Sequence, residues 1–135
     1  MRILVVEDDF ISRRLLCRYL EPFGECDVAI NGQEALLAVD SAIKTGEQYD
    51  LICLDIMMPE MDGHESLQKI RALEARDGLP VGMGSKIIMT TSLEDHRNIR
   101  EAFCSSAVGY VVKPIEKKKL IQTLNDLGLE LEIPF

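Results

Sequence analysis

The sequence predicts a single α/β domain built on a parallel, doubly wound sheet. Short apolar runs alternate five times with segments whose apolar residues recur at helical spacing. This alternation is typical of a parallel sheet that is covered by helices on both faces. The 135 residues are enough for one domain with a sizeable core. Right-handed crossover connections restrict the topology to a doubly wound five-stranded sheet.

Five apolar runs predict the strands. A run of four or more apolar residues between turn-forming residues is typical of a strand that is buried on both faces. The clearest run is Leu51-Ile52-Cys53-Leu54, which Asp55 follows directly. The predicted strands, in chain order, are 3–6, 26–30, 51–54, 87–90 and 110–112.

Five segments with apolar residues at helical spacing predict the helices. The first begins at Phe10, and Pro22 and Gly24 end it, whereas the fourth is polar and has few apolar residues. The segment 77–85 contains three glycines and a proline, so we expect a loop with local mobility there. The predicted helices, in chain order, are 10–23, 33–44, 63–76, 95–105 and 116–127.

Composition and charge limit the possible functions. The formal net charge of −8 disfavours non-specific binding to nucleic acid, and 47% hydrophobic residues indicate a globular chain. No apolar run approaches the length that crosses a bilayer, and the N-terminus lacks the pattern of a signal peptide. None of the four cysteines forms a C-x-x-C pair, so we expect reduced thiols in a cytoplasmic protein rather than disulfides.

Polar residues follow four of the predicted strands, and a parallel sheet brings them to one edge. Each has a simpler interpretation when taken alone: the acids and hydroxyls could cap helices, Asp55 could begin a turn, and Lys113 could be solvated. Their joint occurrence, strand by strand, favours a common site. The residues are Glu7, Asp8 and Asp9 after the first strand, Asp55 after the third, Thr90, Thr91 and Ser92 at the fourth, and Lys113 after the fifth.

The chemistry of such a cluster is that of phosphoryl transfer. Clustered carboxylates repel one another unless a cation lies among them, and an all-oxygen site suits Mg²⁺. A carboxylate can then attack a phosphoryl group and form an aspartyl phosphate, while a lysine and a hydroxyl bind the phosphoryl oxygens. We assign Asp55 as the nucleophile and Asp8 as the metal ligand, with Thr91 and Lys113 contacting the phosphoryl group.

Four strings in the chain resemble the receiver domain of two-component response regulators, in particular its stand-alone, chemotaxis-type members. They are ILVVEDD at 3–9, DIMMPEMDG at 55–63, IIMTTS at 87–92 and GYVVKP at 109–114. The resemblance covers about residues 2–128. It implies a flavodoxin-like sheet of strand order 2-1-3-4-5, a receiver domain at 1–128 and a C-terminal tail at 129–135.

The resemblance also implies a role for each site residue. Asp55 is the phosphoacceptor, and Mg²⁺ or Mn²⁺ is bound by Asp55, directly by Asp8 and mostly through water by Glu7. The main-chain carbonyl of Met57 is the family's remaining metal ligand. Lys113 contacts the phosphate, and a cis bond is expected between Lys113 and Pro114.

Two residues match the family's conformational switch. Thr91 is the switch hydroxyl, since Thr90 takes the apolar place before it, and Tyr110 is the switch aromatic. Phosphorylation adds negative charge to an acidic pocket and should draw Thr91 inward, which leaves room for Tyr110. The alternative for Tyr110 is an ordinary half-buried tyrosine at the edge of the sheet.

Two departures from the family pattern are visible. Thr91 lies 36 residues after Asp55, several more than is usual, and the extra length falls in segment 77–85. Met57 lies two residues after the acceptor, and Leu93 lies two residues after the switch threonine. In the family, the residues at these two positions flank the path of the hydrolytic water. Neither side chain can orient water by hydrogen bonding, so we expect slow self-dephosphorylation.

The expected function is that of a stand-alone response regulator. Its partners would be a sensor histidine kinase or a histidine phosphotransfer protein and an unidentified output protein, with no direct nucleic-acid contact and no membrane insertion. The tail 129–135 alternates apolar and acidic residues, so it adds an edge strand, packs on a neighbour as a homodimer contact, or is a loosely docked terminus. We expect no enzymatic activity beyond the chain's own phosphorylation and slow dephosphorylation.

Three rival functions are less consistent with the residues. An aspartyl phosphatase or phosphotransferase generally needs a second aspartate where this chain has Met57. A flavodoxin-like cofactor binder needs a phosphate loop after the first strand, where three acids would repel a phosphate. A degenerate receiver that serves only for docking would not need the complete set of site residues.

Overall fold

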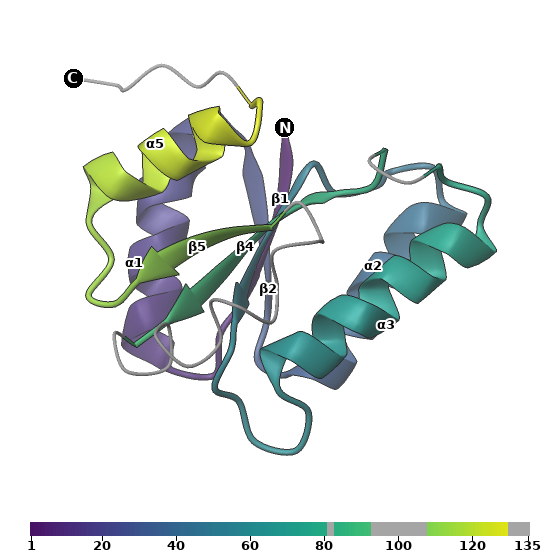
Figure 1. Ribbon diagram of the computed structural model, residues 1–135, viewed down its shortest axis with the longest axis horizontal. Helices are drawn as coiled ribbons and strands as arrows, with labels where there is room; N and C mark the ends of the chain where they lie inside the picture. Colours follow the sequence, from purple (N-terminus) through teal and green to yellow (C-terminus); the bar gives the residue numbers. More distant parts are fainter. Residues whose placement is uncertain (81–82, 93–107, 130–135) are drawn as a thin grey trace.

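The fold is a five-stranded parallel sheet with helices on both faces (Figure 1). It comes from a computed structural model that describes residues 1–80, 83–92 and 108–129. The strand order is β2-β1-β3-β4-β5, which confirms the predicted fold class. The strands are β1 Arg2–Val6, β2 Glu25–Ala29, β3 Leu51–Asp55, β4 Lys86–Thr91 and β5 Val108–Val112.

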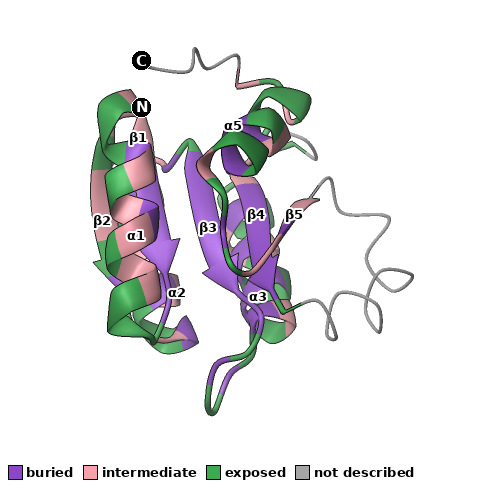
Figure 2. Cartoon of the chain, turned by 90° about the vertical axis from the view of Figure 1, so that its left-hand side faces the viewer, coloured by how far each residue is buried: buried purple, intermediate pink, exposed green. Residues whose placement is uncertain are grey.

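Four α-helices lie within the described residues, and they cover the sheet in two pairs. Helices α1 and α5 lie on one face, and α2 and α3 lie on the other (Figure 1). The sheet therefore separates two apolar clusters, and buried residues follow β1, β3 and β4 along their length (Figure 2). The helices are α1 Phe10–Leu20, α2 Gly32–Lys44, α3 Gly63–Arg76 and α5 Lys117–Asp126.

The first helix is shorter than predicted, because the α-helix ends at Leu20 rather than at residue 23. Glu21–Phe23 form a 3-10 turn instead. Pro22 has no N–H to donate to the helix, and its ring would clash with the carbonyl group four residues earlier. Pro22 therefore ends the α-helix before Phe23, the last apolar residue of the helical pattern.

The second strand begins and ends one residue earlier than predicted, and at Ile30 the backbone N–H is already bonded to a side chain of α2. The Ile30 N–H donates to Glu34 Oε1 at 3.0 Å, and the Glu34 N–H donates to Asn31 Oδ1 at 2.8 Å. This reciprocal cap satisfies backbone donors that the helix leaves unpaired. The predicted helix at 95–105 lies outside the described residues.

A buried carboxylate anchors the end of the long segment between α3 and β4. Glu74 accepts a hydrogen bond from the Ser85 N–H at 2.7 Å and one from Arg71 Nη1 at 2.7 Å. A Cβ atom on Gly84 would lie 2.3 Å from the Glu74 carboxylate oxygens, so any larger residue there would displace the carboxylate from these hydrogen bonds. The mobility expected in segment 77–85 stays a prediction, and residues 81–82 lie outside the described residues.

The described cysteines, Cys17, Cys26 and Cys53, are free thiols, and Cys53 is fully buried. This arrangement agrees with the expectation of reduced thiols, whereas Cys104 lies outside the described residues. Within 1–80, 83–92 and 108–129, none of the helices combines the length and the apolar character that crossing a membrane requires.

Candidate functional site

Three carboxylates meet where β1 and β3 end. Oxygen atoms of Glu7, Asp8 and Asp55 all lie within 4.8 Å of one another. Glu7 is fully buried, Asp55 is 3% exposed and Asp8 is exposed, so the cluster opens to solvent on the side of Asp8. The structure thus brings together the carboxylates that the sequence predicts at this edge of the sheet.

Lys113, which follows β5, reaches two of these carboxylates. Its Nζ lies 3.1 Å from Glu7 Oε1 and 3.3 Å from Asp55 Oδ1. The Lys113 N–H also donates to the carbonyl of Thr91 at 2.7 Å, which holds the end of β5 against β4. The peptide bond between Lys113 and Pro114 is cis, as the resemblance implies.

The electrostatics of the cluster follow from burial and from these charges. Burial and the neighbouring Asp55 raise the pKa of Glu7 to about 7, although Lys113 opposes the shift. Burial alone would lower the pKa of Lys113, but the two carboxylates outweigh burial and raise it. With all three acids ionised, one ammonium leaves an excess of two negative charges, which a divalent cation would offset.

The donor set fits a hard divalent cation. Carboxylate and carbonyl oxygens are the ligands of Mg²⁺, which keeps several waters when it is bound. Asp8 is open to water, whereas Glu7 is buried and paired with Lys113. This difference agrees with a direct role for Asp8 and an indirect role for Glu7.

Asp9 has a separate, structural role. Its side chain accepts a hydrogen bond from the Ser12 N–H at 2.9 Å and caps α1. The capping interpretation of the acidic run therefore holds for Asp9. Because the cap is provided by Asp9, the Asp8 carboxylate can belong to the cluster.

Met57 and Thr91 lie near the cluster in different ways. The Met57 N–H donates to Asp55 Oδ1 at 3.3 Å, while its side chain is 63% exposed. The assignment of its carbonyl as a metal ligand stays a prediction. Thr91 is 1% exposed, and its hydroxyl donates to the carbonyl of Ser92 at 3.2 Å rather than to Asp55.

Tyr110 is half-buried and packs against the apolar cluster under α2 and α3. Its register partner on β4 is Met89, so Tyr110 and Thr91 lie on the same face of the sheet. This placement is compatible both with a switch aromatic and with an ordinary half-buried tyrosine. The switch role stays a prediction.

Thr90 takes an apolar place in the family pattern, yet it lies beside the site. In the structure Thr90 is fully buried and is the register partner of Asp55. A hydroxyl in a place that usually holds an apolar side chain was the available signal. The register that puts it beside Asp55 is visible only in the folded sheet.

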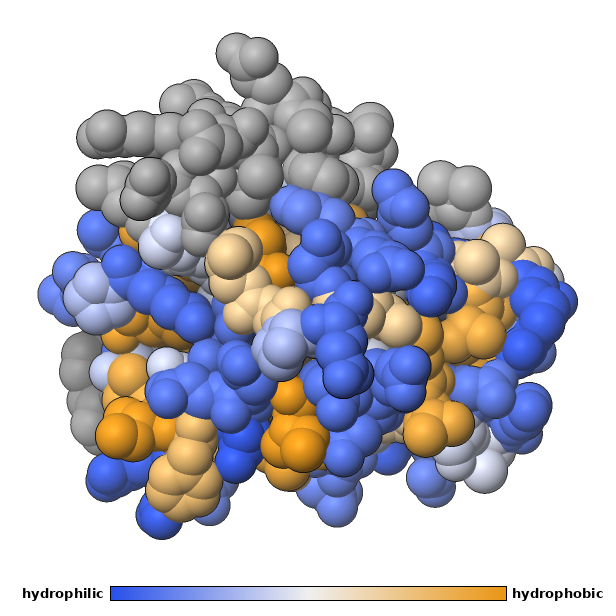
Figure 3. All heavy atoms as spheres, turned by 90° about the horizontal axis from the view of Figure 1, so that it is seen from below, coloured by the Kyte–Doolittle hydropathy of each residue, from blue (hydrophilic) through white to orange (hydrophobic). Residues whose placement is uncertain are grey.

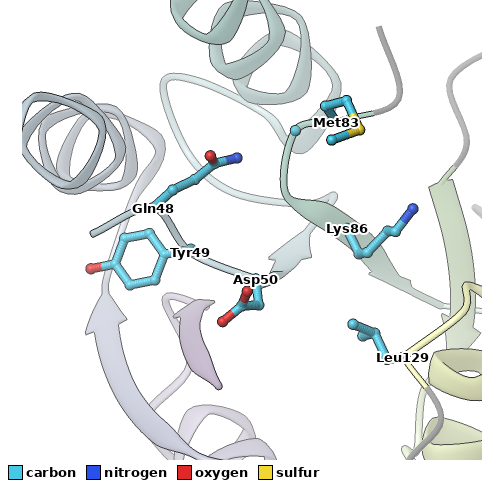
Figure 4. Close-up of a pocket in the computed structure, with 7 residues that line it drawn as sticks. Gln48, Tyr49, Asp50, Met83, Lys86 and Leu129 are labelled. Carbon is cyan, nitrogen blue, oxygen red and sulfur yellow. The ribbon is translucent and has the colours of Figure 1, made fainter. Parts of the chain in front are cut away.

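The two edges of the sheet present different surfaces. Figure 3 looks onto the side where the strands end, and apolar residues there lie in separate groups among hydrophilic ones. A shallow pocket of about 210 Å³ lies at the opposite edge, where β3 and β4 begin, and no residue of the carboxylate cluster lines it (Figure 4). Its lining residues are Gln48, Tyr49, Asp50, Met83, Gly84, Lys86 and Leu129.

The fold and the site define a class: doubly wound α/β domains with an acidic cluster and a lysine at the carboxyl edge of the sheet. The family model of the response regulator receiver domain matches residues 3–125. The chain belongs to this family, which confirms the resemblance found in the sequence.

Relatives of the chain differ greatly in length. It is 32% identical over 129 residues to the chemotaxis protein CheY of Halobacterium salinarum, covering 93% of this chain and 95% of that protein. It is 35% identical over 128 residues to the osmosensing histidine protein kinase SLN1 of Saccharomyces cerevisiae, covering 93% of this chain but spanning only 10% of the kinase.

Among solved structures, the chain is similar to the receiver domain of the histidine kinase CKI1 from Arabidopsis thaliana, solved in complex with Mg²⁺ and BeF₃⁻. The TM-score is 0.70 at 27% identity, and the match covers 93% of this chain and 88% of that one.

Proposed function

We propose that this chain accepts a phosphoryl group on Asp55 from a histidine kinase or a histidine phosphotransfer protein and signals to a partner protein. The observation that carries the proposal is the contact of Lys113 Nζ with Glu7 and Asp55 beside the exposed Asp8. The site offers an acceptor carboxylate, a cation that can follow the phosphoryl charge, and oxygen ligands for a metal ion.

The reaction transfers one phosphoryl group. A carboxylate oxygen of Asp55 attacks the phosphorus of a phosphohistidine, so that an O–P bond forms and the P–N bond breaks. The electron pair of the P–N bond stays on the imidazole nitrogen, which then takes a proton from water. The product is an acyl phosphate on Asp55.

Each remaining residue of the site has a task in this transfer. Asp55, Asp8 and the Met57 carbonyl would hold Mg²⁺ or Mn²⁺, with Glu7 acting through water; when bound, this ion supplies positive charge to the phosphoryl oxygens. Support comes from the similar CKI1 receiver domain, which was solved with Mg²⁺ and BeF₃⁻. Lys113, already 3.3 Å from Asp55 Oδ1, neutralises further charge on those oxygens.

Signalling follows from the added charge. The phosphoryl group should draw the Thr91 hydroxyl away from the carbonyl of Ser92 and toward Asp55. The space that Thr91 vacates lies on the face where Tyr110 packs, so Tyr110 turns inward. The altered surface would be recognised by an output protein, and the chain would act as a stand-alone cytoplasmic regulator.

The principal test is phosphorylation by acetyl phosphate with Mg²⁺, followed by intact mass. Wild type should gain one phosphoryl group, and Asp55→Asn should gain none. Asp9→Asn is the matched control, because it makes the same change in the acidic run while asparagine still caps a helix. Labelling of Asp55→Asn would show that another residue is the acceptor. Thr91→Ala should be phosphorylated but should signal weakly.

A second test concerns the lifetime of the phosphoryl group. The exposed thioether of Met57 cannot orient a hydrolytic water, and Leu93, the other flanking residue, lies outside the described residues. Phosphate loss from purified protein should therefore be slow, and Met57→Asn, which adds a hydrogen-bonding side chain, should accelerate it severalfold. Loss of the label within a few seconds from wild type would contradict the proposal of slow self-dephosphorylation.

A further inference from the structure

Thr90 lies on the face of the sheet that α1 and α5 cover. It belongs to a row of paired residues, one from each of β3, β4 and β5, at the end of the sheet that carries the site. Its register partners are Asp55 on β3 and Val111 on β5. Ile88, two residues before Thr90, packs in the cluster of that face. Because side chains alternate along a strand, Thr90 lies on the same face as Ile88, and Asp55 lies on the same face as Cys53.

The hydroxyl of Thr90 has no hydrogen-bond partner within the part of the chain that the structure describes, although the residue is fully buried. A buried hydroxyl without a partner destabilises a folded protein, and an apolar side chain of the same shape would avoid that cost. A residue that breaks this rule inside a functional site indicates a role in another state of the site.

The path of the Lys113 side chain identifies the candidate partner of this hydroxyl in the phosphorylated state. Lys113 follows β5, yet its Nζ contacts Asp55 at the end of β3. Strand β4 lies between β3 and β5, and Thr90 is the residue of β4 in this row. The lysine side chain therefore reaches across the end of β4, whose last two residues are Thr90 and Thr91.

We propose that Thr90 is a positioning residue for phosphoryl transfer, an inference that rests on the proposed function of Asp55. When Asp55 becomes an acyl phosphate, its carboxylate charge is lost and the negative charge lies on the phosphoryl oxygens. The oxygen that is bonded to phosphorus is then a weaker acceptor for Lys113 Nζ. The ammonium follows that charge, and the Thr90 hydroxyl accepts one of its three N–H groups. The hydroxyl thus orients Lys113 as the phosphoryl group arrives.

The experiment compares Thr90→Val, which keeps the shape and removes the hydroxyl, with Thr90→Ser, which keeps the hydroxyl. Thr45→Val makes the same change at an exposed hydroxyl on the end of α2 and is the matched control. The rate of phosphorylation by acetyl phosphate and Mg²⁺ is measured by intact mass, and the urea midpoint of unfolding is measured on the same samples.

Thr90→Val should unfold at a higher urea concentration than wild type, because the unpaired hydroxyl is gone, yet it should be phosphorylated about tenfold more slowly. Thr90→Ser keeps the hydroxyl and Thr45→Val lies away from the site, so both should be phosphorylated within about twofold of wild type. A merely structural role would not move stability and rate in opposite directions.

Three outcomes overturn the inference, and they are distinguishable from one another. If wild type is phosphorylated and Thr90→Val matches its rate, the hydroxyl does not position Lys113, while the proposed function stands. If wild type itself is not phosphorylated at all, the proposed function fails and the inference fails with it. A slow Thr90→Val that is also less stable, with an equally slow Thr90→Ser, would indicate a packing defect and would likewise contradict the inference.

Discussion

Replacing Glu74 by glutamine tests whether the buried carboxylate anchors the segment before β4. Glu74 is 4% exposed, and it accepts hydrogen bonds from the Ser85 N–H and from Arg71 Nη1, both at 2.7 Å. Glutamine has nearly the same shape. Its amide oxygen can accept one of the two bonds, but its NH₂ group then faces the other donor.

The magnitude follows from these two contacts. A hydrogen bond to a charged group contributes about 1.5–3 kcal/mol, whereas a neutral one contributes about 1 kcal/mol. Glu74→Gln replaces two hydrogen bonds to a charged group by one neutral hydrogen bond and one contact between two donors. The free energy of unfolding should therefore fall by about 3 kcal/mol. At roughly 4 °C per kcal/mol for a domain of this size, Glu74→Gln should lower Tm by roughly 12 °C.

Urea unfolding monitored by circular dichroism measures the change, and Glu47→Gln is the control. The Glu47 side chain is 68% exposed and 4.0 Å from Arg2, so its loss should cost less than about 0.5 kcal/mol. Exchange of the Ser85 amide hydrogen should accelerate in Glu74→Gln. Phosphorylation should be unchanged, because Ser85 precedes β4 and Thr90 lies near its other end.

The anchoring role of Glu74 would be wrong if both glutamine variants had free energies of unfolding within about 0.5 kcal/mol of wild type. That result would mean that the desolvation of Glu74 cancels its hydrogen bonds, as occurs in some buried ion pairs. The segment before β4 would then be held by its apolar contacts alone.

Three further predictions concern single side chains. Burial and the Asp27 carboxylate raise the pKa of Tyr49 to about 12. The folded state therefore holds this proton more tightly than the unfolded chain, and the resulting stability is present below pH 10.0 and lost as the pH rises toward 12. Urea titrations should show that this loss disappears in Tyr49→Phe. Burial raises the pKa of the Cys53 thiol, so peptide mapping should find it alkylated by iodoacetamide only after unfolding. Asp9→Ala should lower the urea midpoint of unfolding and Asp9→Asn should leave it nearly unchanged, because asparagine caps a helix as well as aspartate.

The sequence was sufficient to predict the order of elements and the edge of the sheet that carries the site. Strands that are buried on both faces give apolar runs such as 51–54. Charged residues that follow such runs lie at the same edge of a parallel sheet, outside the core. The predicted end of α1 was wrong because two local signals compete there. Phe23 continues the apolar pattern of α1, but Pro22 has already ended its hydrogen bonding.

Register is the part of the site that the sequence could not predict. A strand that is buried on both faces is apolar at every position, so its pattern does not tell which residue lies opposite which. The pairing of Thr90 with Asp55 depends on contacts between segments far apart in the chain. The partner of Glu74 is hidden for the same reason. The available signal was its charge at a position of α3 that is buried along with Leu67 and Ile70.

The last two residues of β4 divide the site between the two faces of the sheet. Thr90 lies with Glu7, Asp55 and Lys113 on the face that α1 and α5 cover, where the charges are. Thr91 lies on the opposite face with Tyr110. A single strand end can therefore couple phosphoryl transfer to a change of surface, because the two threonines are joined by one peptide bond. We expect substitutions at Thr90 to alter the rate of phosphorylation and substitutions at Thr91 to alter the response to it. If both positions affected only one of these two measurements, the division between the faces would be wrong.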